Sequence, residues 1–257
     1  MDTLQVERAD GVVSVTLNRP AKKNAINQQM WDELLAVFTE IGASTDDRIV
    51  VVSGAGGSFC SGADLTDLSG GADTHFLNRM RHVGDVCLAL HNLPQPTIAK
   101  VVGVAAGAGA NLAFGCDLVV AADDARFSEI FSRRGLSIDF GGSWVLPRLI
   151  GLHRAKELAF FADILSAKEI ADIGLVNRVV SVAEIDVFVA DWAARLAAGP
   201  PLALSMTKKM LDESSTSSLA QALEHEAVAQ TVNFGSADTA EAMQAFVLKR
   251  DPVFRGR

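Results

Sequence analysis

The sequence predicts an α/β protein with a helical C-terminal region. Short runs rich in valine and isoleucine alternate with amphipathic helical patterns over about the first 150 residues, which is typical of α/β folds. Two of the predicted strands run into glycine-bearing loops that precede a helix. Beyond these segments the pattern is almost entirely helical. We therefore expect a core domain over residues 1–199 and a helical region over residues 200–257.

A hairpin and a helix are expected first. Leu4–Arg8 and Val12–Leu17 alternate apolar and polar side chains around Asp10-Gly11, a dipeptide that favours the type I′ turn of two-residue hairpins. A helix is expected to begin near Asn27, because apolar side chains follow at helical spacing. They are Met30, Leu34, Val37, Phe38 and Ile41.

The core then continues as alternating strands and helices. Ile49–Ser53 has the length and apolar character of a buried strand and leads into a glycine-rich loop. A helical stretch over 75–91 is followed by two prolines, which do not continue a helix. Thr97–Val104 predicts one further strand, whose glycine-rich end opens a helix through Phe114. Leu118–Ala122 predicts the next strand.

Most of the remaining chain is expected to be helical. Ser166 and Glu169 stand at the spacing of a capping box, which marks a helix start. Pro200 and Pro201 separate the last core helix from the C-terminal region. The expected helices are Arg154–Phe161, a segment from Ser166, Asp186–Leu196, Leu202–Asp212, Leu219–Val232 and Thr239–Lys249.

The composition excludes several classes of function. The formal net charge of −8 argues against a nucleic-acid partner, since phosphate binding needs a basic face. Cys60, Cys87 and Cys116 have neither disulfide nor metal-ligand spacing, so we expect free thiols and no metal. The longest uncharged stretch, 101–116, is too short to span a bilayer, and residues 1–10 lack an apolar leader. We expect a cytoplasmic protein without a membrane partner.

The two glycine-bearing loops, 58–65 and 104–111, carry the strongest chemical signal. Small residues let a ligand approach the main chain, and free N–H groups at a helix start attract developing negative charge. The second loop lacks G-x-G-x-x-G spacing, and Ser61 is not in a G-x-S-x-G elbow. Two such loops suggest an oxyanion hole, in which two N–H donors stabilise a negatively charged oxygen.

A series of short motifs runs through the chain in a recognisable order. They are Leu17–Pro20 with Asn24-Ala25, Phe59–Leu65, Gly103–Asp117, Gly141–Ser143 with Leu146–Gly151, Ala171 with Gly174–Val176, and Lys249-Arg250 with Pro252 and Phe254. In these segments the chain resembles the crotonase (enoyl-CoA hydratase/isomerase) superfamily over essentially its whole length. The resemblance implies a ββα spiral core and a C-terminal helical trimerisation region, in a homotrimer or homohexamer. It also implies an acyl-CoA thioester substrate and no cofactor beyond its coenzyme A moiety.

The resemblance also implies the binding residues. The backbone N–H groups of Ser61 and Ala108 would hold the thioester oxygen, where most relatives have alanine and glycine. The adenine end of coenzyme A would lie against Ala21–Ala25, with Lys22 and Lys23 near its phosphates. The implied substrate-binding residues are Lys23, Ala25, Gly62, Ala63, Asp64, Leu65, Gly107, Phe131, Phe246 and Lys249, of which Phe246 and Lys249 would close over the coenzyme A.

The acid/base residues distinguish the reactions of the superfamily. Its hydratases use two glutamates, but Asn111 and Phe131 occupy the matching positions here. Asp139 stands where its isomerases carry a catalytic aspartate, and segments 103–110 and 135–144 resemble the ring-1,2-epoxyphenylacetyl-CoA isomerase type. Hydration needs two acid/base groups, whereas a 1,3-shift of a double bond needs one. We therefore expect an enoyl-CoA isomerase in which Asp139, between apolar neighbours, has a raised pKa.

Several alternatives stay open at the level of sequence. Asp139 could instead cap the helix that follows Gly141. Glu129, expected at the surface, could enter the pocket after a change of register, and Asn111 could orient substrate or be a satisfied buried amide. The loop Thr66–Asn78 is expected to shape the acyl pocket. There are two alternative functions: an enoyl-CoA hydratase, which would be a lyase of fatty-acid β-oxidation, or a non-catalytic acyl-CoA-binding protein.

Overall fold

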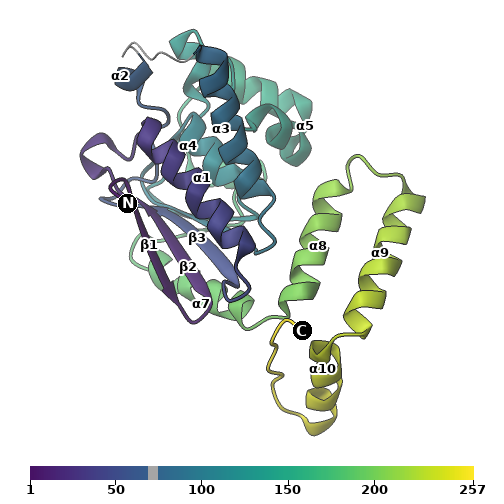
Figure 1. The fold of residues 1–257 in the computed structure, drawn as a ribbon. Coiled ribbons are helices and arrows are strands. Elements are labelled where there is room, and N and C mark those ends of the chain that lie inside the picture. Colours follow the sequence, from purple (N-terminus) through teal and green to yellow (C-terminus); the bar gives the residue numbers. More distant parts are fainter. Residues whose placement is uncertain (69–74) are drawn as a thin grey trace.

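The computed structural model describes residues 1–68 and 75–257, which form an α/β core and a helical arm (Figure 1). The larger sheet has the strand order β1-β2-β3-β4-β6-β9, and the smaller sheet has the order β5-β7-β8. The strands are β1 (Leu4–Ala9), β2 (Val12–Leu17), β3 (Ile49–Gly54), β4 (Thr97–Val101), β5 (Val104–Ala106), β6 (Leu118–Ala122), β7 (Arg126–Ser128), β8 (Leu165–Ser166) and β9 (Arg178–Val180). The predicted α/β class is confirmed.

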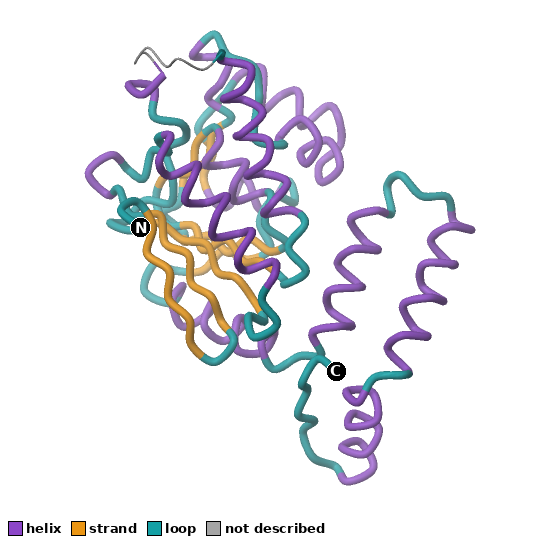
Figure 2. The backbone as a smooth tube through the Cα atoms, viewed as in Figure 1, coloured by secondary structure: helices purple, strands orange, loops and turns teal. Residues whose placement is uncertain are grey.

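The helices lie on both faces of the larger sheet. They are α1 (Gln28–Ala43), α2 (Leu65–Leu68), α3 (Phe76–His91), α4 (Ala108–Phe114), α5 (Gly142–Phe161), α6 (Ala167–Asp172), α7 (Ile185–Ala197), α8 (Pro201–Glu213), α9 (Leu219–Phe234) and α10 (Ala237–Leu248). Helices α1 and α3 pack against each other over one face, while α7 contacts β3, β4 and β6 from the other (Figures 1 and 2). The central strands β3, β4 and β6 are therefore buried on both faces, as parallel strands usually are.

The predicted hairpin and first helix are confirmed. Asp10 and Gly11 have φ values of 51° and 78°, the left-handed pair that a type I′ turn requires. Strands β1 and β2 are antiparallel, and the larger sheet is parallel from β2 onward. Asn27 caps α1, because its side-chain oxygen accepts a hydrogen bond from the N–H of Met30 at 3.0 Å. The apolar residues predicted for this helix are all buried.

The single strand predicted over Thr97–Val104 is wrong. Gly103 has a φ of +60°, and the chain divides there into β4 of the larger sheet and β5 of the smaller sheet. Strands β6 and β7 repeat this arrangement, and after β3 the residue Cys60 forms a parallel bridge with Ala105 of β5. Two successive turns of the core thus add one strand to each sheet, and the turn after β3 adds a strand to the larger sheet and a single bridge to the smaller one. This is the ββα spiral that the family resemblance implies.

Strands β7, β8 and β9 were not expected from the sequence. Each is only two or three residues long, so neither alternation nor an apolar run distinguishes it from a loop. Their pairing depends on neighbours that are distant in the sequence: β8 pairs with β7, and β9 pairs with β6. The capping box of Ser166 and Glu169, a purely local signal, is confirmed at the start of α6.

The C-terminal helices α8, α9 and α10 form an arm beside the core (Figure 1). Lys208 of α8 connects the arm to the core. Its Nζ lies 2.8 Å from the Asp117 carboxylate and donates to the Gln95 carbonyl at 3.2 Å. Large apolar side chains of the arm stay exposed, and Phe246 is 84% exposed. Within residues 1–68 and 75–257, no helix combines the length and apolar character needed to cross a membrane. The division into two domains stays a prediction.

The packing of α1 yields a prediction about stability. Leu34→Ala removes a fully buried side chain, and such core truncations lower the free energy of unfolding by about 2.7–5 kcal/mol. Leu88→Ala on α3 truncates a side chain that is 56% exposed. This variant should change the free energy of unfolding by about 0.5 kcal/mol or less. Urea unfolding of both variants measures the difference. Equal losses would contradict the central place of α1 in the core.

Candidate active site

A cavity of about 410 Å³ lies where the two glycine-bearing loops meet the segment 137–139. Its walls are mainly apolar and come from α1, α3 and the segment 130–138. The apolar lining includes Trp31, Met80, Val83, Phe131, Leu136 and Ile138. Ala63, Ala108 and Asp139 face the same space. Because such walls lower the local dielectric, charges and N–H dipoles at the cavity act more strongly than in water.

The first loop presents a free N–H group at Ala63. Residues around it run extended beside Ile26: the Ile26 N–H donates to the Gly62 carbonyl at 2.8 Å, and the Asp64 N–H donates to the Ile26 carbonyl at 2.8 Å. Successive N–H groups of an extended chain point to opposite sides, so the Ala63 N–H points away from Ile26. No hydrogen bond between described residues uses it.

The second loop presents the N–H of Ala108. Gly107 precedes α4 with a φ of 54°, and Ala108 is the first residue of the helix, where N–H groups have no intrahelical acceptor. The two loops touch: a Cβ on Gly62 would lie 2.8 Å from the Ala106 carbonyl oxygen and 3.7 Å from the Ala108 nitrogen. Gly62 also has a φ of +97°. Only glycine permits this approach of the two backbones.

The predicted donor at Ser61 requires a correction. Its N–H already donates to the Lys23 carbonyl at 3.0 Å, and its hydroxyl donates to the Lys22 carbonyl at 3.2 Å. Ser61 lines the cavity, but its N–H is engaged within the protein. Ala63 and Ala108 therefore each present an N–H group at the cavity that has no acceptor among the described residues. The predicted segment around Ser61 lines the cavity. Which of its N–H groups is free depends on the backbone hydrogen bonds with residues 23–26.

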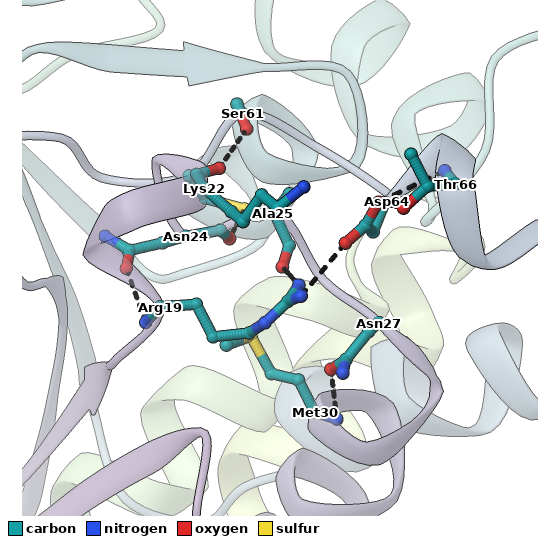
Figure 3. Close-up of polar contacts among 10 residues, drawn as sticks. Arg19, Lys22, Asn24, Ala25, Asn27, Met30, Ser61, Asp64 and Thr66 are labelled. Atoms are coloured by element: carbon teal, nitrogen blue, oxygen red, sulfur yellow. Dashed lines mark hydrogen bonds and ion pairs between the residues drawn. The ribbon is translucent and has the colours of Figure 1, made fainter.

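Arg19 holds the first loop in place (Figure 3). Its guanidinium donates to the Ala25 carbonyl and pairs with the Asp64 carboxylate at 3.0 Å. Asp64 also accepts from the N–H of Thr66 at 3.1 Å and from its hydroxyl at 2.7 Å. The Thr66 hydrogen bonds, and then Arg19, lower the pKa of Asp64 despite its burial. Asp64 thus caps α2, and both oxygens of its ionised carboxylate are hydrogen-bonded.

Asn24 supports the same region from the other side. It is fully buried in the left-handed conformation with a φ of 55°, next to Lys23 with a φ of 48°. Its side chain accepts from the Arg19 N–H at 2.9 Å and donates to the carbonyls of Ala55 at 2.9 Å and Ser58 at 2.7 Å. The sequence contained Arg19 and Asn24 only as motif residues. Their role in aligning the loops becomes visible in the hydrogen bonds.

Asp139 lines the cavity with a free carboxylate oxygen. Its Oδ1 is buried and has no hydrogen-bond partner among the described residues. Burial raises the pKa of Asp139 to about 6. The alternative in which Asp139 caps the next helix is wrong, since the cap residue of α5 is Gly141 and no side chain bonds to that helix end. A carboxyl with this pKa can accept and return a proton near neutral pH.

The backbone after Asp139 is strained in a way that fixes this side chain. Phe140 has a φ of 44°, which costs energy for a residue with a bulky side chain, and Gly141 follows with a φ of 76°. The Phe140 ring is 4% exposed and stacks on Trp31 with ring centroids 5.4 Å apart. Packing against α1 therefore maintains the turn that directs Asp139 toward the cavity.

Glu129 and Asn111 lie next to Asp139 but do not line the cavity. The expectation that Glu129 is a surface residue is wrong, because it is 3% exposed. The Asn111 amide donates to the Glu129 carboxyl at 3.3 Å and to the Asp139 carbonyl at 2.9 Å, while its own oxygen has no partner among the described residues. Asn111 is therefore only partly satisfied. Neither residue carries a signal in the sequence that would show this contact.

The structure brings most of the predicted binding residues to one cavity. Gly62, Asp64, Leu65, Gly107 and Phe131 line it, together with the residues already named. The predicted coenzyme A residues lie elsewhere: Lys23 is exposed beside the first loop, Ala25 is half-buried, and Phe246 and Lys249 belong to the arm. Part of the loop expected to shape the pocket, residues 69–74, lies outside the described residues. Over the described part of the chain, no cluster of histidine, cysteine and acidic residues could hold a metal ion.

Comparison with known proteins identifies the family. Residues 7–257 match the family model of enoyl-CoA hydratase/isomerase. A Rhodobacter capsulatus protein named probable enoyl-CoA hydratase is 40% identical over 99% of this chain and 98% of its own length. The 1,2-epoxyphenylacetyl-CoA isomerase of Escherichia coli is 36% identical over 96% of each chain. The crystal structure of an enoyl-CoA hydratase from Bacillus anthracis gives a TM-score of 0.95 at 31% identity, covering 99% of this chain and 100% of that one.

The fold and the cavity between two glycine-bearing loops define a crotonase-type protein. The chain belongs to the enoyl-CoA hydratase/isomerase family. The resemblance noted in the sequence and the crotonase-like fold are thereby confirmed. The named relatives include both a hydratase and an isomerase, so the particular reaction has to be argued from the site.

The contacts of Arg19 yield a second prediction. Arg19→Met leaves the buried Asp64 carboxylate without its cation and should lower the free energy of unfolding by about 1–3 kcal/mol at pH 7. Because the folded pKa of Asp64 is below its unfolded value of 3.8, the wild-type advantage exists above that value and is lost as pH falls below it. Urea unfolding at pH 7 and pH 3 tests this. Arg195→Met, which breaks an exposed pair with Asp191, is the control, and a loss of the same size there would contradict the prediction.

Proposed function

We propose that this protein isomerises an enoyl-CoA thioester by moving its double bond along the acyl chain. One observation carries the proposal. Asp139 is half-buried at the cavity, and its buried Oδ1 has no hydrogen-bond partner among the described residues, whereas Asp64, the other carboxyl among the described lining residues, is occupied by Arg19 and Thr66. Within the described part of the chain, the site therefore offers one free acid/base group beside two N–H donors, which suits a proton shuttle better than the addition of water.

The N–H groups of Ala63 and Ala108 are proposed to receive the thioester oxygen. When a proton leaves the carbon next to the thioester, negative charge moves onto this oxygen. Two fixed N–H dipoles in an apolar cavity stabilise it without reorganisation, and one such donor is typically worth about 2.7–4 kcal/mol in the transition state. The proposal keeps the predicted role of Ala108 and replaces Ser61 with Ala63.

Asp139 is proposed to carry the proton in both directions. As a carboxylate it removes a proton from C2 of a thioester whose double bond joins C3 and C4, and the electron pair delocalises onto the thioester oxygen. The protonated Asp139 then returns the proton to C4, and the double bond joins C2 and C3. No water is consumed, and the carboxylate is regenerated. The raised pKa of Asp139, about 6, matches a group that must act as a base and then as an acid.

The cavity walls favour an apolar acyl group. Trp31, Met80 and Val83 line the side of α1 and α3, and Phe131 and Ile138 line the opposite side. Such walls bind hydrocarbon or aromatic groups and exclude water, which would otherwise intercept the enolate. Lys23 is exposed, and its carbonyl accepts the Ser61 N–H, so it lies beside the first glycine-bearing loop of the cavity. We propose that its ammonium group binds the phosphates of coenzyme A.

The arm is proposed to complete the coenzyme A site in an oligomer. Phe246 is 84% exposed and Val247 is 76% exposed, which is unusual for large apolar side chains on one helix. Packing of α10 on a neighbouring subunit would bury them and bring Phe246 and Lys249 to a coenzyme A molecule. The family resemblance favours a homotrimer or homohexamer, with no cofactor beyond the substrate's own coenzyme A.

Enoyl-CoA hydratase remains the second candidate, on a specific observation. Glu129 is a second buried carboxyl linked to the Asp139 segment through Asn111, so two acidic groups lie close together. Against it, Glu129 does not line the cavity, and Phe131 occupies the space where hydratases of the family carry an acid. Fast hydration of crotonyl-CoA would favour this candidate. Acyl-CoA binding without turnover over a broad panel of thioesters would instead indicate a binding protein.

The role of Asp139 gives a third prediction. Asp139→Asn removes the proton carrier but keeps shape, so double-bond migration in a 3-enoyl-CoA should fall by about 10²–10⁴-fold. Acyl-CoA affinity should change little, as isothermal titration calorimetry can show. Asp191→Asn, at an exposed position on α7, is the matched control. Unchanged turnover in the Asp139 variant would remove the mechanism.

The oxyanion hole gives a fourth prediction. Ala108→Pro deletes the N–H donor at the first position of α4, where proline is well tolerated in helices. We expect kcat/KM to fall by about 10²–10³-fold with little change in Tm. Ala108→Gly keeps the N–H and should lose far less. If both variants lost activity equally, the N–H of residue 108 would not be the group that matters.

A further inference from the structure

Three polar side chains form a cluster at the cavity: Asn111 and Glu129 are buried behind it, and Asp139, which lines it, is half-buried. Asn111 is 1% exposed and Glu129 is 3% exposed. Each side chain has one buried oxygen without a hydrogen-bond partner among the described residues, namely Oδ1 of Asn111, Oε1 of Glu129 and Oδ1 of Asp139. Unsatisfied buried polar atoms are costly and rare. Three acceptors in one cluster indicate that the cluster contains a donor.

The hydrogen bonds of Asn111 determine which carboxyl oxygen of Glu129 can carry a proton. Its Nδ2 donates to the Asp139 carbonyl at 2.9 Å and to Oε2 of Glu129 at 3.3 Å, so both amide protons are used. The reversed amide would place Oδ1 against the Asp139 carbonyl oxygen, two acceptors in contact. Oε2 of Glu129 is therefore an acceptor. Oε1 is the atom of Glu129 that is left to hold a proton.

Arg79 and Arg134 line the same cavity as Asp139, but neither arginine lowers the raised pKa of Asp139 or of Glu129. Glu129 faces the neutral Asn111 amide on α4 and the carboxyl of Asp139, and no ion pair between described residues includes either acid. Cys87 on α3 also faces Asp139, and burial together with that carboxyl raises the thiol pKa to about 11, so the thiol is neutral. Two adjacent carboxylates in such surroundings repel each other strongly.

The pKa values agree with this electrostatic picture. Burial raises the pKa of Glu129 to about 8, against the opposing effect of the Asn111 hydrogen bond and with a further increase from the charge of Asp139. Burial raises the pKa of Asp139 only to about 6. As pH rises, Asp139 therefore ionises first, and Glu129 keeps its proton through the neutral range.

We propose that Glu129 is a positioning residue that holds a proton on Oε1 and so limits the Glu129–Asp139 pair to one negative charge, carried by Asp139. The inference rests on the proposed role of Asp139 as the base. The protonated Oε1 is a donor and satisfies an acceptor of the cluster, directly or through one water. The charge that attacks the substrate is thereby confined to the carboxyl that lines the cavity.

This arrangement has a consequence at alkaline pH. When Glu129 ionises, a second buried charge lies near the enolate that forms during the reaction and raises its energy. Water would also enter to solvate the new carboxylate, which weakens the oxyanion hole. Activity should therefore require Asp139 to be ionised and Glu129 to be protonated, which produces a bell-shaped pH profile.

The pH profile of kcat/KM with a 3-enoyl-CoA tests the role of Glu129. Wild type should show an acid limb near pH 6 and an alkaline limb above pH 8 that falls about tenfold per pH unit. Glu129→Gln keeps the neutral, hydrogen-bonding form and should lose the alkaline limb while retaining the acid limb. Glu157→Gln, an exposed residue on α5, is the matched control and should keep both limbs. An alkaline limb that persists in Glu129→Gln, or an acid limb that moves to lower pH, overturns the inference.

Infrared spectroscopy of the resting protein tests the proton itself, independently of turnover. At pH 7 the wild type should show the C=O stretch of a buried protonated carboxyl, which disappears above about pH 8 and is absent in Glu129→Gln. Asp139→Asn should retain the band. This variant therefore provides a second test if Glu129→Gln folds poorly. A missing band in wild type and in Asp139→Asn overturns the inference and leaves the proposed isomerase intact. Unchanged turnover in Asp139→Asn would instead contradict the proposed isomerase mechanism.

Discussion

The close approach of two backbone segments is the constraint on which the site depends. Gly62 lies so near the Ala106 carbonyl that no side chain fits between them, and its left-handed backbone requires glycine. This contact brings the extended segment around Ala63 beside the first turn of α4. Two N–H groups without an acceptor among the described residues, at Ala63 and Ala108, consequently face one cavity. Unsatisfied donors are unfavourable in the free protein and become favourable when an oxygen acquires charge between them.

The apolar walls of the cavity serve the chemistry in two ways. They exclude water, which strengthens the interaction of N–H dipoles with an enolate. They also raise the pKa of Asp139 to a value at which the carboxyl can both take and return a proton. The strained turn at Phe140 is stabilised by its stack on Trp31, so the hydrophobic core maintains an unfavourable backbone conformation at the site.

The acid/base residues explain how one fold is compatible with hydratase and isomerase relatives. The oxyanion hole is built from main-chain atoms and tolerates changes of side chain. In the proposed mechanism the proton-transfer group is a side chain: the family resemblance implies that Asn111 and Phe131 stand at the two positions used by hydratases, and Asp139 is the proposed alternative. Glu129 adds a buried acid whose contacts lead to Asp139 rather than to the cavity. On this proposal, a few side chains around a main-chain site determine the reaction.

The sequence by itself determined the elements that depend on local interactions: the hairpin at Asp10-Gly11, the amphipathic α1, the capping box at Ser166 and the glycine-bearing loops, as well as the family to which these motifs belong. Local periodicity and turn chemistry are encoded within a few residues, so they can be read directly. Only the tertiary structure decided that the free donor of the first loop is Ala63 rather than Ser61, because Lys23, far along the chain, accepts the Ser61 N–H. It likewise decided that Glu129 is buried beside Asp139. Hydrogen bonds and burial between segments distant in sequence have no local signature, and at this site they select which groups remain free to act.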